Sequence, residues 1–244
     1  MSSPNPYESI AQEYKASKQL PFRTHIEAYT LFELLGDVTG LSVLELACGE
    51  GFYTRQIRKA GAATIIGIDL SPAMIALARE EEERSPLGCE YDVGDATKLA
   101  KPEKYDVVFG AYLLNYASSP EMLKDFAMSI FNHLKPGGRF IGINDNPAQD
   151  PSTYGSGTPY GFSKSTTPDR QEGDPITWTL QTPDGETFAF DNYYLAPDTV
   201  ASVFESVGFK RFSWEGPWLA PDAEPGFWGS FMANPPIIGV FAER

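Results

Sequence analysis

The sequence predicts an α/β domain with a doubly wound, mostly parallel sheet. Three features indicate this fold: apolar segments that alternate with helix-like ones, a glycine-rich turn after the first apolar segment, and acidic residues at the ends of the next two. The chain has 244 residues, of which 42% are hydrophobic. This length and composition suit a single domain with insertions better than two separate domains.

Strand candidates alternate with helix candidates through the middle of the chain. Five strands are expected, over residues 42–47, 64–70, 89–94, 105–112 and 139–144. Two of the intervening helices open with a Ser-Pro pair, at Ser71 and Ser119. There the serine can accept a hydrogen bond from a free helix amide, and the proline presets the helical φ. Strands and helices at this spacing imply a parallel sheet with helices on both faces.

The segments that flank this core have other patterns. Residues 7–35 are aromatic and helical in pattern, with a break at Pro21. Residues 147–175 are rich in Pro, Gly, Ser and Thr, which predicts a long loop, and residues 176–195 are expected to form a hairpin that turns at 182–185. Because the loop follows the fifth strand, it can fold over the carboxyl edge of the sheet, where ligands bind in such folds.

A helix over 199–207 and strands over 210–215 and 237–242 complete the expected elements. The whole chain is therefore interpreted as one domain over residues 1–244. Its expected parts are a helical cover (1–35), a ligand-binding core (36–146), an insertion that forms a lid (147–195) and a C-terminal helix with strands (196–244).

The charge and cysteine content exclude several classes of function. Lys and Arg number 19 against 33 Asp and Glu, which gives a net charge of −14 and disfavours nucleic acids and anionic membranes as partners. No stretch approaches the ~18 apolar residues that a membrane span needs, so we expect a cytoplasmic protein. The two cysteines, Cys48 and Cys89, lie in no metal-binding motif. We expect neither a disulfide nor a metal site.

The glycine-rich turn spans residues 45–51, between the first strand and the first helix of the core. Gly49 and Gly51 allow a tight turn and a close approach of a ligand to the backbone. Alone, this pattern is equally compatible with an ordinary turn. Thr54 stands where a dinucleotide motif would require a third glycine. The segment 45–54 carries two Glu and no Lys or Arg, which favours a ligand with cationic groups over a pyrophosphate.

Acidic residues end the next two strands. Asp69 follows the second strand, where a carboxylate can accept both hydroxyls of a ribose. Asp95 closes the third strand, where a carboxylate can accept the exocyclic amine of adenine. The alternative for Asp95 is a turn-forming role. Together with the glycine turn, the two acids predict an adenosine-containing ligand.

These segments resemble the motifs of class I S-adenosylmethionine (SAM)-dependent methyltransferases. Residues 43–51 are similar to motif I of that family and residues 66–72 to its second motif. Residues 94–96 resemble the adenine-binding motif, and residues 134–140 the turn before the fifth strand. One departure is Ala47, where the family commonly has glycine. The motifs occur in order over about residues 40–145, which is more specific than any single one.

The resemblance implies a Rossmann-like, seven-stranded sheet whose last strand is antiparallel. It also implies SAM as the cofactor, with the following contacts: Glu45, Ala47, Gly49 and Ala111 near the methionine end, Asp69 on the ribose, Leu70 against the adenine, and Asp95 and Ala96 at the adenine edge.

Two pairs of residues outside these motifs complete the expected site. Tyr14 and Arg23 lie in the helical cover, which often closes the SAM pocket in this family. Arg23 has two interpretations, a charge-assisted contact with the methionine carboxylate or a surface arginine. Asn115 and Tyr116 follow the fourth strand, where many family members orient the acceptor; packing is the alternative for Tyr116. These two are the candidate catalytic residues.

A narrower resemblance involves residues 21–24, 47–55, 111–117 and 144–147. They look like bacterial proteins related to toxoflavin synthase, which N-methylates a fused azaheterocycle. The expected function is SN2 methyl transfer from SAM to a small planar heterocycle or aromatic, on nitrogen rather than oxygen, by a monomer or homodimer. The alternatives are a small-molecule O-methyltransferase, an aminopropyltransferase that uses decarboxylated SAM, and a non-catalytic SAM-binding protein.

Overall fold

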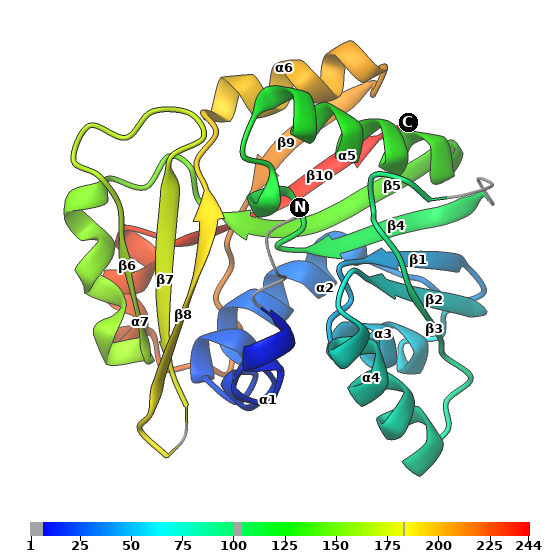
Figure 1. The fold of residues 1–244 in the computed structure, drawn as a ribbon, viewed down its shortest axis with the longest axis horizontal. Helices are drawn as coiled ribbons and strands as arrows, with labels where there is room; N and C mark the ends of the chain where they lie inside the picture. Colours follow the sequence, from blue (N-terminus) through cyan, green and yellow to red (C-terminus); the bar gives the residue numbers. More distant parts are fainter. Residues whose placement is uncertain (1–6, 100–103, 183) are drawn as a thin grey trace.

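The computed structural model describes residues 7–99, 104–182 and 184–244, and a seven-stranded sheet forms its centre (Figure 1). From edge to edge the strands are β3 (Glu90–Val93), β2 (Thr64–Asp69), β1 (Ser42–Leu46), β4 (Tyr105–Ala111), β5 (Leu134–Asp145), β10 (Ile237–Glu243) and β9 (Arg211–Glu215). Strands β1 to β5 are parallel, and β10 runs antiparallel to both of its neighbours. The Rossmann-like sheet with an antiparallel last strand is therefore confirmed.

Helices cover both faces of this sheet (Figure 1). One face carries α2 (Tyr29–Leu35), α3 (Phe52–Lys59) and α4 (Pro72–Arg84), and the other carries α5 (Pro120–His133) and α6 (Pro197–Val207). Alternate side chains of each strand serve alternate faces. In β5, Ile141 packs toward the first set of helices and Phe140 toward the second.

Local capping explains where two of these helices begin. The Ser71 hydroxyl accepts a hydrogen bond from the amide of Met74, and the Ser119 hydroxyl accepts one from Met122, each at 3.3 Å. A proline occupies the first turn of both helices. These are the contacts that the two Ser-Pro pairs predict.

The N-terminal segment lies between the sheet and the region that follows β5 (Figure 1). It contains α1 (Tyr7–Ser17) and a short π-helix, η1 (Arg23–Ala28), which runs directly into α2. Helix α1 contacts α4 of the core. On its other side, the ring of Tyr14 lies 6.0 Å from that of Phe190. The cover therefore touches both the core and the insertion.

The insertion contains more regular structure than its composition predicts. The expected hairpin is present as β7 (Pro175–Gln181) and β8 (Thr187–Tyr193), but the preceding segment is not simply a loop. It forms a 3₁₀ helix, η3 (Pro151–Tyr160), and a strand, β6 (Phe162–Ser165), that pairs with β7. The Asp150 side chain accepts a hydrogen bond from the amide of Ser152 and so starts η3. Proline and glycine here shape a short helix rather than prevent one.

A further helix, α7 (Pro225–Ala233), lies between β9 and β10, where the sequence analysis expected no element. Its Trp228 ring stacks on Tyr160 of η3, with ring centroids 5.1 Å apart. The Tyr160 hydroxyl also lies 2.6 Å from the Ser230 hydroxyl. The burial that stabilises α7 thus comes from aromatic partners far away in the chain, which local periodicity cannot reveal.

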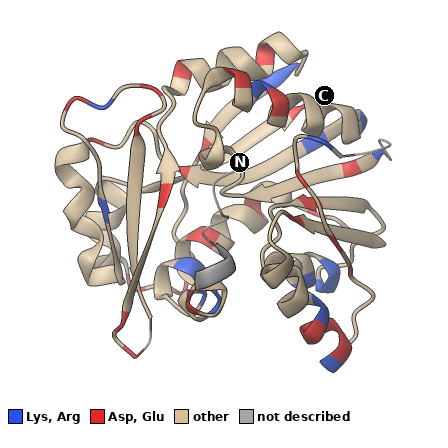
Figure 2. Cartoon of the chain, viewed as in Figure 1, with Lys and Arg blue, Asp and Glu red and all other residues tan. Residues whose placement is uncertain are grey.

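Two further features are the apolarity of the helices and the distribution of charged residues. Among the described helices, none combines the length and apolarity that spanning a lipid bilayer requires. In Figure 2, acidic and basic residues occur in several helices, strands and loops.

Candidate functional site

The glycine turn joins β1 to α3 in a left-handed backbone conformation. Ala47, Gly49 and Gly51 have φ values of 56°, 56° and 81°. A non-glycine residue in this region costs roughly 1–2 kcal/mol, which is a physical reason for glycine at the position of Ala47. A Cβ added to Gly51 would lie 2.5 Å from the hydroxyl oxygen of Tyr91, whereas one added to Gly49 would meet nothing within 4 Å. The turn therefore packs on the core at Gly51 and faces open space at Gly49.

Asp69 ties the end of β2 to this turn. Its carboxylate accepts hydrogen bonds from the amides of Gly49 and Ser71, both at 2.8 Å. The two bonds hold the carboxylate at the end of β2, beside the turn, where the sequence motifs predict a contact with ribose. The neighbouring Leu70 is 59% exposed, and Val93 at the end of β3 is 49% exposed. Two exposed apolar side chains beside an acid are what an adenosine group would cover.

Asp95 forms a turn. It accepts hydrogen bonds from the amide and hydroxyl of Thr97, at 2.9 and 2.7 Å, and pairs with the exposed Lys98 at 3.1 Å. The turn-forming interpretation thus holds in this structure, and a contact with adenine stays a prediction. Ala96 beside it is half-buried.

Glu45 is a buried acid below the glycine turn. It is 1% exposed and accepts a hydrogen bond from the Thr54 hydroxyl at 2.5 Å. Burial raises the pKa of Glu45 to about 8, against the opposing effects of the Thr54 hydrogen bond and of Lys18. No ion pair to Glu45 exists in the described part of the chain. A ligand ammonium would supply the positive charge that this carboxyl lacks.

Lys18 is a buried residue near the first turn of α3. Its ammonium lies 4.9, 5.6 and 5.2 Å from the ring centroids of Tyr14, Phe52 and Tyr53. Within the described ranges this ammonium has no hydrogen bond or ion pair, although Lys18 is 9% exposed. Cation–π contacts offset only part of the cost of burying a charge. The sequence analysis missed Lys18, because only its four-residue spacing from Tyr14 distinguishes it from surface lysines.

Arg23 is not on the surface, so the surface-arginine interpretation is wrong. It is buried and pairs with Glu27, with 2.7 Å between Nη1 and Oε2. Tyr53 donates a hydrogen bond to the same carboxylate at 2.6 Å, and Tyr112 donates another. Burial alone would raise the pKa of Glu27, but Arg23, Lys18 and the two hydroxyls lower it below its ordinary value. Glu27 was also missed, although its four-residue spacing from Arg23 is a recognisable signal.

These charges fit SAM. Its amino-acid end carries one ammonium and one carboxylate, and the turn is flanked by one unpaired buried carboxyl, Glu45, and one unpaired buried ammonium, Lys18. Its adenosine end matches Asp69 and the exposed Leu70. The residues present therefore suit the cofactor that the sequence motifs imply.

The candidate acceptor residues lie after β4, in the 3₁₀ turn η2 (Leu114–Tyr116). Asn115 is 1% exposed, and its Oδ1 accepts a hydrogen bond from the amide of Asp145 at 3.1 Å. Tyr116 packs instead with Tyr14 in a small apolar cluster that joins α1 to α4. Ala111, half-buried, is the last residue of β4. The structure thus brings Asn115 to the end of β5 and Tyr116 to the cover.

A buried ion pair, also missed from the sequence, connects β5 to the insertion. Lys164 of β6 lies 2.5 Å from Oδ1 of Asp145, and its ammonium lies 4.2 Å from the ring centroid of Tyr154. Burial raises the pKa of Asp145, against the effect of Lys164, and burial lowers the pKa of Lys164. The two residues come from separate parts of the chain, so no local motif marks them.

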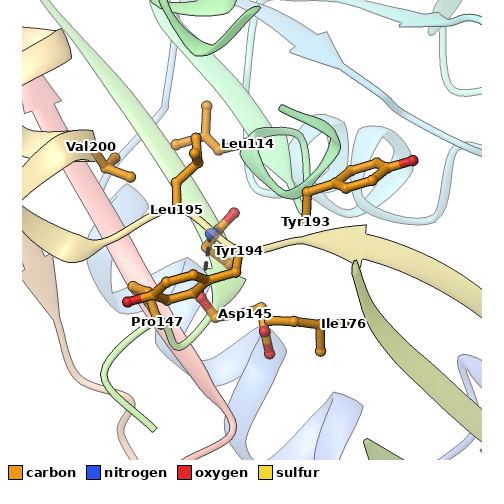
Figure 3. Close-up of a pocket in the computed structure, with 9 residues that line it drawn as sticks. Leu114, Asp145, Pro147, Ile176, Tyr193, Tyr194, Leu195 and Val200 are labelled. Atoms are coloured by element: carbon orange, nitrogen blue, oxygen red, sulfur yellow. Dashed lines mark hydrogen bonds between the residues drawn. The ribbon is translucent and has the colours of Figure 1, made fainter. Parts of the chain in front are cut away.

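A cavity of about 10 Å³ opens at the end of β5 (Figure 3). Its lining residues are Leu114, Asn144, Asp145, Pro147, Ile176, Tyr193, Tyr194, Leu195 and Val200. Figure 3 shows apolar side chains of Leu114, Leu195 and Val200 on one side and the ring of Tyr194 on the other. The core, η2, α6 and the insertion all contribute to this cavity.

Comparison with known proteins gives a family match over the region around the glycine turn. Residues 43–138 match the family model described as "Methyltransferase domain". This stretch includes the glycine turn, Asp69, Asp95 and the fourth strand. The match covers the region in which the sequence motifs resemble those of class I SAM-dependent methyltransferases.

Curated relatives of this methyltransferase domain are similar over part of their length. A demethylmenaquinone methyltransferase of Lactococcus lactis is 32% identical over 56% of this chain and 56% of its own. A ubiquinone biosynthesis O-methyltransferase of Pseudomonas fluorescens is 33% identical over 46% of this chain and 48% of its own. A ribosomal protein L11 methyltransferase of Burkholderia vietnamiensis is 36% identical over 41% of this chain and 30% of its own. The chain thus spans about half or less of these relatives.

A solved structure has the same fold over nearly the whole chain. A SAM-dependent methyltransferase from Clostridium acetobutylicum aligns with a TM-score of 0.66 and 15% identity, and covers 98% of this chain and 99% of its own. At this identity the likeness concerns the fold alone. It includes the insertion and the C-terminal elements that the family match leaves out.

Proposed function

We propose that this protein transfers the methyl group of SAM to a small planar heterocycle or aromatic ring, on nitrogen rather than oxygen. One observation carries the first part of this proposal. The glycine turn faces open space at Gly49, is held by the Asp69 carboxylate, and lies near the buried Glu45 carboxyl and the Lys18 ammonium, neither of which has an ion-pair partner among the described residues. This arrangement complements a nucleoside joined to an amino acid.

The contacts of the cofactor follow from this arrangement. Asp69 accepts the ribose hydroxyls, Leu70 lies against the adenine, and Asp95 with Ala96 borders the adenine edge. Glu45 binds the ammonium, and Lys18 binds the carboxylate. Arg23 contributes through its Nε, which has no hydrogen-bond partner among the described residues. Ala47 and Gly49 contribute backbone, and Tyr14 and Ala111 border the methionine end.

Bound SAM supplies an activated methyl group, which an acceptor atom can attack in line. The protein therefore has to bind both partners in the right orientation and exclude water. Such positioning lowers a barrier by up to about 7–11 kcal/mol. Asn115 lies after β4, beside the end of β5, and orients the acceptor, while Tyr116 closes the cover next to Tyr14. In this proposal residues 147–195 act as the lid.

The preference for a neutral, planar nitrogen acceptor has two supports. The net charge of −14 disfavours polyanions, and Asn115 and Asn144 bring neutral amides to the end of the sheet. The aromatic residues of the insertion support it less, because Tyr160 and Trp178 are buried in the core. A second candidate is O-methylation, with the Asp145 carboxylate, which lines the cavity at the end of β5, as the group that accepts the proton of a hydroxyl.

A competition assay tests this proposal. Purified protein with methyl-labelled SAM is offered a fused nitrogen heterocycle, a catechol, a small aliphatic amine, a short RNA and a ribosomal protein, and products are identified by mass. We expect label in the heterocycle first. Preference for the amine, the RNA or the protein would contradict the acceptor class, and preference for the catechol would establish the O-methyltransferase alternative.

A further inference from the structure

The carboxylate of Glu27 joins the cover to the core. Glu27 lies in η1 of the cover and is 0% exposed. Its Oε1 accepts a hydrogen bond from the hydroxyl of Tyr53 in α3 at 2.6 Å, and its Oε2 accepts one from the hydroxyl of Tyr112, which follows β4. Both hydroxyls belong to the core, so these two bonds are a polar link that holds η1 against it.

Tyr112 makes its part of this link from an unusual backbone conformation. Its φ is 63°, and among the described residues the only other non-glycine residue with a positive φ is Ala47. Such a conformation costs roughly 1–2 kcal/mol, so it persists only where surrounding contacts hold it. The amide of Tyr112 donates to the carbonyl of Ile143 at 2.7 Å, and the hydroxyl donates to Glu27. The strained end of β4 is therefore tied to the cover.

The cover brings more positive than negative charge to this place. Arg23 pairs with Glu27 at 2.7 Å, which matches the one negative charge with one positive charge. Lys18 has no ion pair in the parts of the chain that the structure describes, and its ammonium lies 5.2 Å from the ring centroid of Tyr53. Lys18 is nevertheless near enough to lower the pKa of Glu27. Glu27 therefore attracts both cations of the cover.

A buried carboxylate that attracts Lys18 competes with a ligand carboxylate for the same ammonium. The two tyrosine hydroxyls reduce this competition, because each stabilises the charge of Glu27 with a hydrogen bond from the core. Loss of a hydroxyl leaves an acceptor of this carboxylate without its partner, which costs free energy. The ammonium of Lys18 can recover that free energy by moving toward Glu27, and it is then lost to the ligand.

We propose that Tyr53 and Tyr112 are positioning residues for the cofactor. Acting through Glu27, they keep the ammonium of Lys18 available for the carboxylate of SAM. This inference rests on the proposed function, since it concerns the same site and adds how that site selects a ligand with a carboxylate. Recognition of the adenosine end does not depend on the two hydroxyls.

Calorimetry with S-adenosylhomocysteine and its decarboxylated analogue tests this inference on the unaltered protein, Tyr53→Phe and Tyr112→Phe. We expect each variant to bind S-adenosylhomocysteine about 5- to 150-fold more weakly, and to bind the decarboxylated analogue as tightly as the unaltered protein does. Tyr105→Phe is the matched control, because Tyr105 is also buried but begins β4, at the opposite edge of the sheet from the glycine turn. It should change neither affinity.

A double-mutant cycle separates positioning from a structural role. In a Lys18→Met background, Tyr112→Phe should no longer change the affinity for S-adenosylhomocysteine, because the ammonium that the tyrosine keeps available is gone. This cycle decides even if the decarboxylated analogue binds too weakly to measure, and Tyr53→Phe replaces Tyr112→Phe in it if the latter fails to fold.

Three results would overturn the inference: equal weakening of both ligands in the tyrosine variants, an equal effect of the tyrosine substitution with and without Lys18, or unchanged S-adenosylhomocysteine affinity in Tyr53→Phe and Tyr112→Phe. Absence of S-adenosylhomocysteine binding to the unaltered protein would instead contradict the proposed function itself, so the two failures are distinguishable.

Discussion

The proposed cofactor side and the proposed acceptor side of this molecule differ in whether their buried charged residues form ion pairs. Around the glycine turn, Glu45 and Lys18 are buried without ionic partners among the described residues. At the end of β5, Asp145 and Lys164 form a buried ion pair, and the buried atoms without a hydrogen-bond partner among the described residues include Oδ2 of Asp145. A zwitterionic ligand on the first side would account for this difference, because on the second side the protein supplies both charges itself. The predictions below test this contrast.

The largest expected effect concerns Glu45 and stability. The folded protein keeps the Glu45 proton up to a pKa of about 8, whereas the unfolded chain loses it near the ordinary value of 4.5. Between these values the unfolded state binds fewer protons, so the free energy of unfolding falls as pH rises, by about 1.4 kcal/mol per pH unit and up to about 5 kcal/mol in total. Urea titrations should show this loss, and Glu45→Gln should remove it.

Glu33→Gln is the control for this experiment, because Glu33 is exposed on α2. It should leave the slope with pH unchanged. An identical slope in Glu45→Gln and the unaltered protein would mean that Glu45 is not the unpaired buried acid of the cofactor side.

The two sides also differ in how many of their residues could be predicted from the sequence. The proposed cofactor side consists of residues at or after the ends of neighbouring strands, so their spacing in the sequence predicts that Glu45, Gly49, Asp69 and Asp95 lie at one edge of the sheet. Lys18 was missed, because its burial depends on rings that α3 supplies. Asp145 and Lys164 were missed for the same reason, since their pairing requires β6 to lie against the end of β5. Residue spacing in the sequence predicts where the backbone turns, whereas the pairing of buried charges depends on how distant elements pack together.

The second largest effect is expected on the acceptor side. Lys164→Met should leave the carboxylate of Asp145 buried without its cation, which costs about 3–5 kcal/mol of stability in urea unfolding. The affinity for S-adenosylhomocysteine should stay unchanged where the protein is folded, because this pair lies away from the glycine turn.

Arg211→Met provides the comparison, since the Arg211–Glu215 pair is exposed and should contribute about 0–1 kcal/mol. Equal losses of stability in Lys164→Met and Arg211→Met would show that the Lys164–Asp145 pair contributes no more than an exposed ion pair. A loss of affinity for S-adenosylhomocysteine in folded Lys164→Met would contradict the prediction that the end of β5 and the glycine turn act independently.

A smaller effect is expected for Lys18 and is specific to the ligand. Lys18→Met removes the cation proposed to bind the methionine carboxylate, so S-adenosylhomocysteine should bind about 5- to 150-fold more weakly. Its decarboxylated analogue should bind the variant and the unaltered protein equally. Lys59→Met, at the exposed end of α3, should change neither affinity. Equal weakening of both ligands in Lys18→Met would assign Lys18 a structural role instead.

The central claim is that the glycine turn, Asp69 and Asp95 form the cofactor site. Titration calorimetry with S-adenosylhomocysteine tests it most directly, on the unaltered protein, Asp69→Ala and Asp95→Ala. We expect binding to the unaltered protein and a loss of about 5- to 150-fold in Asp69→Ala, because the proposed hydrogen-bond partner of the ribose is removed. A smaller loss is expected in Asp95→Ala, whose carboxylate is shared with Thr97 and Lys98. No binding to the unaltered protein, or equal affinity in all three, would contradict the account.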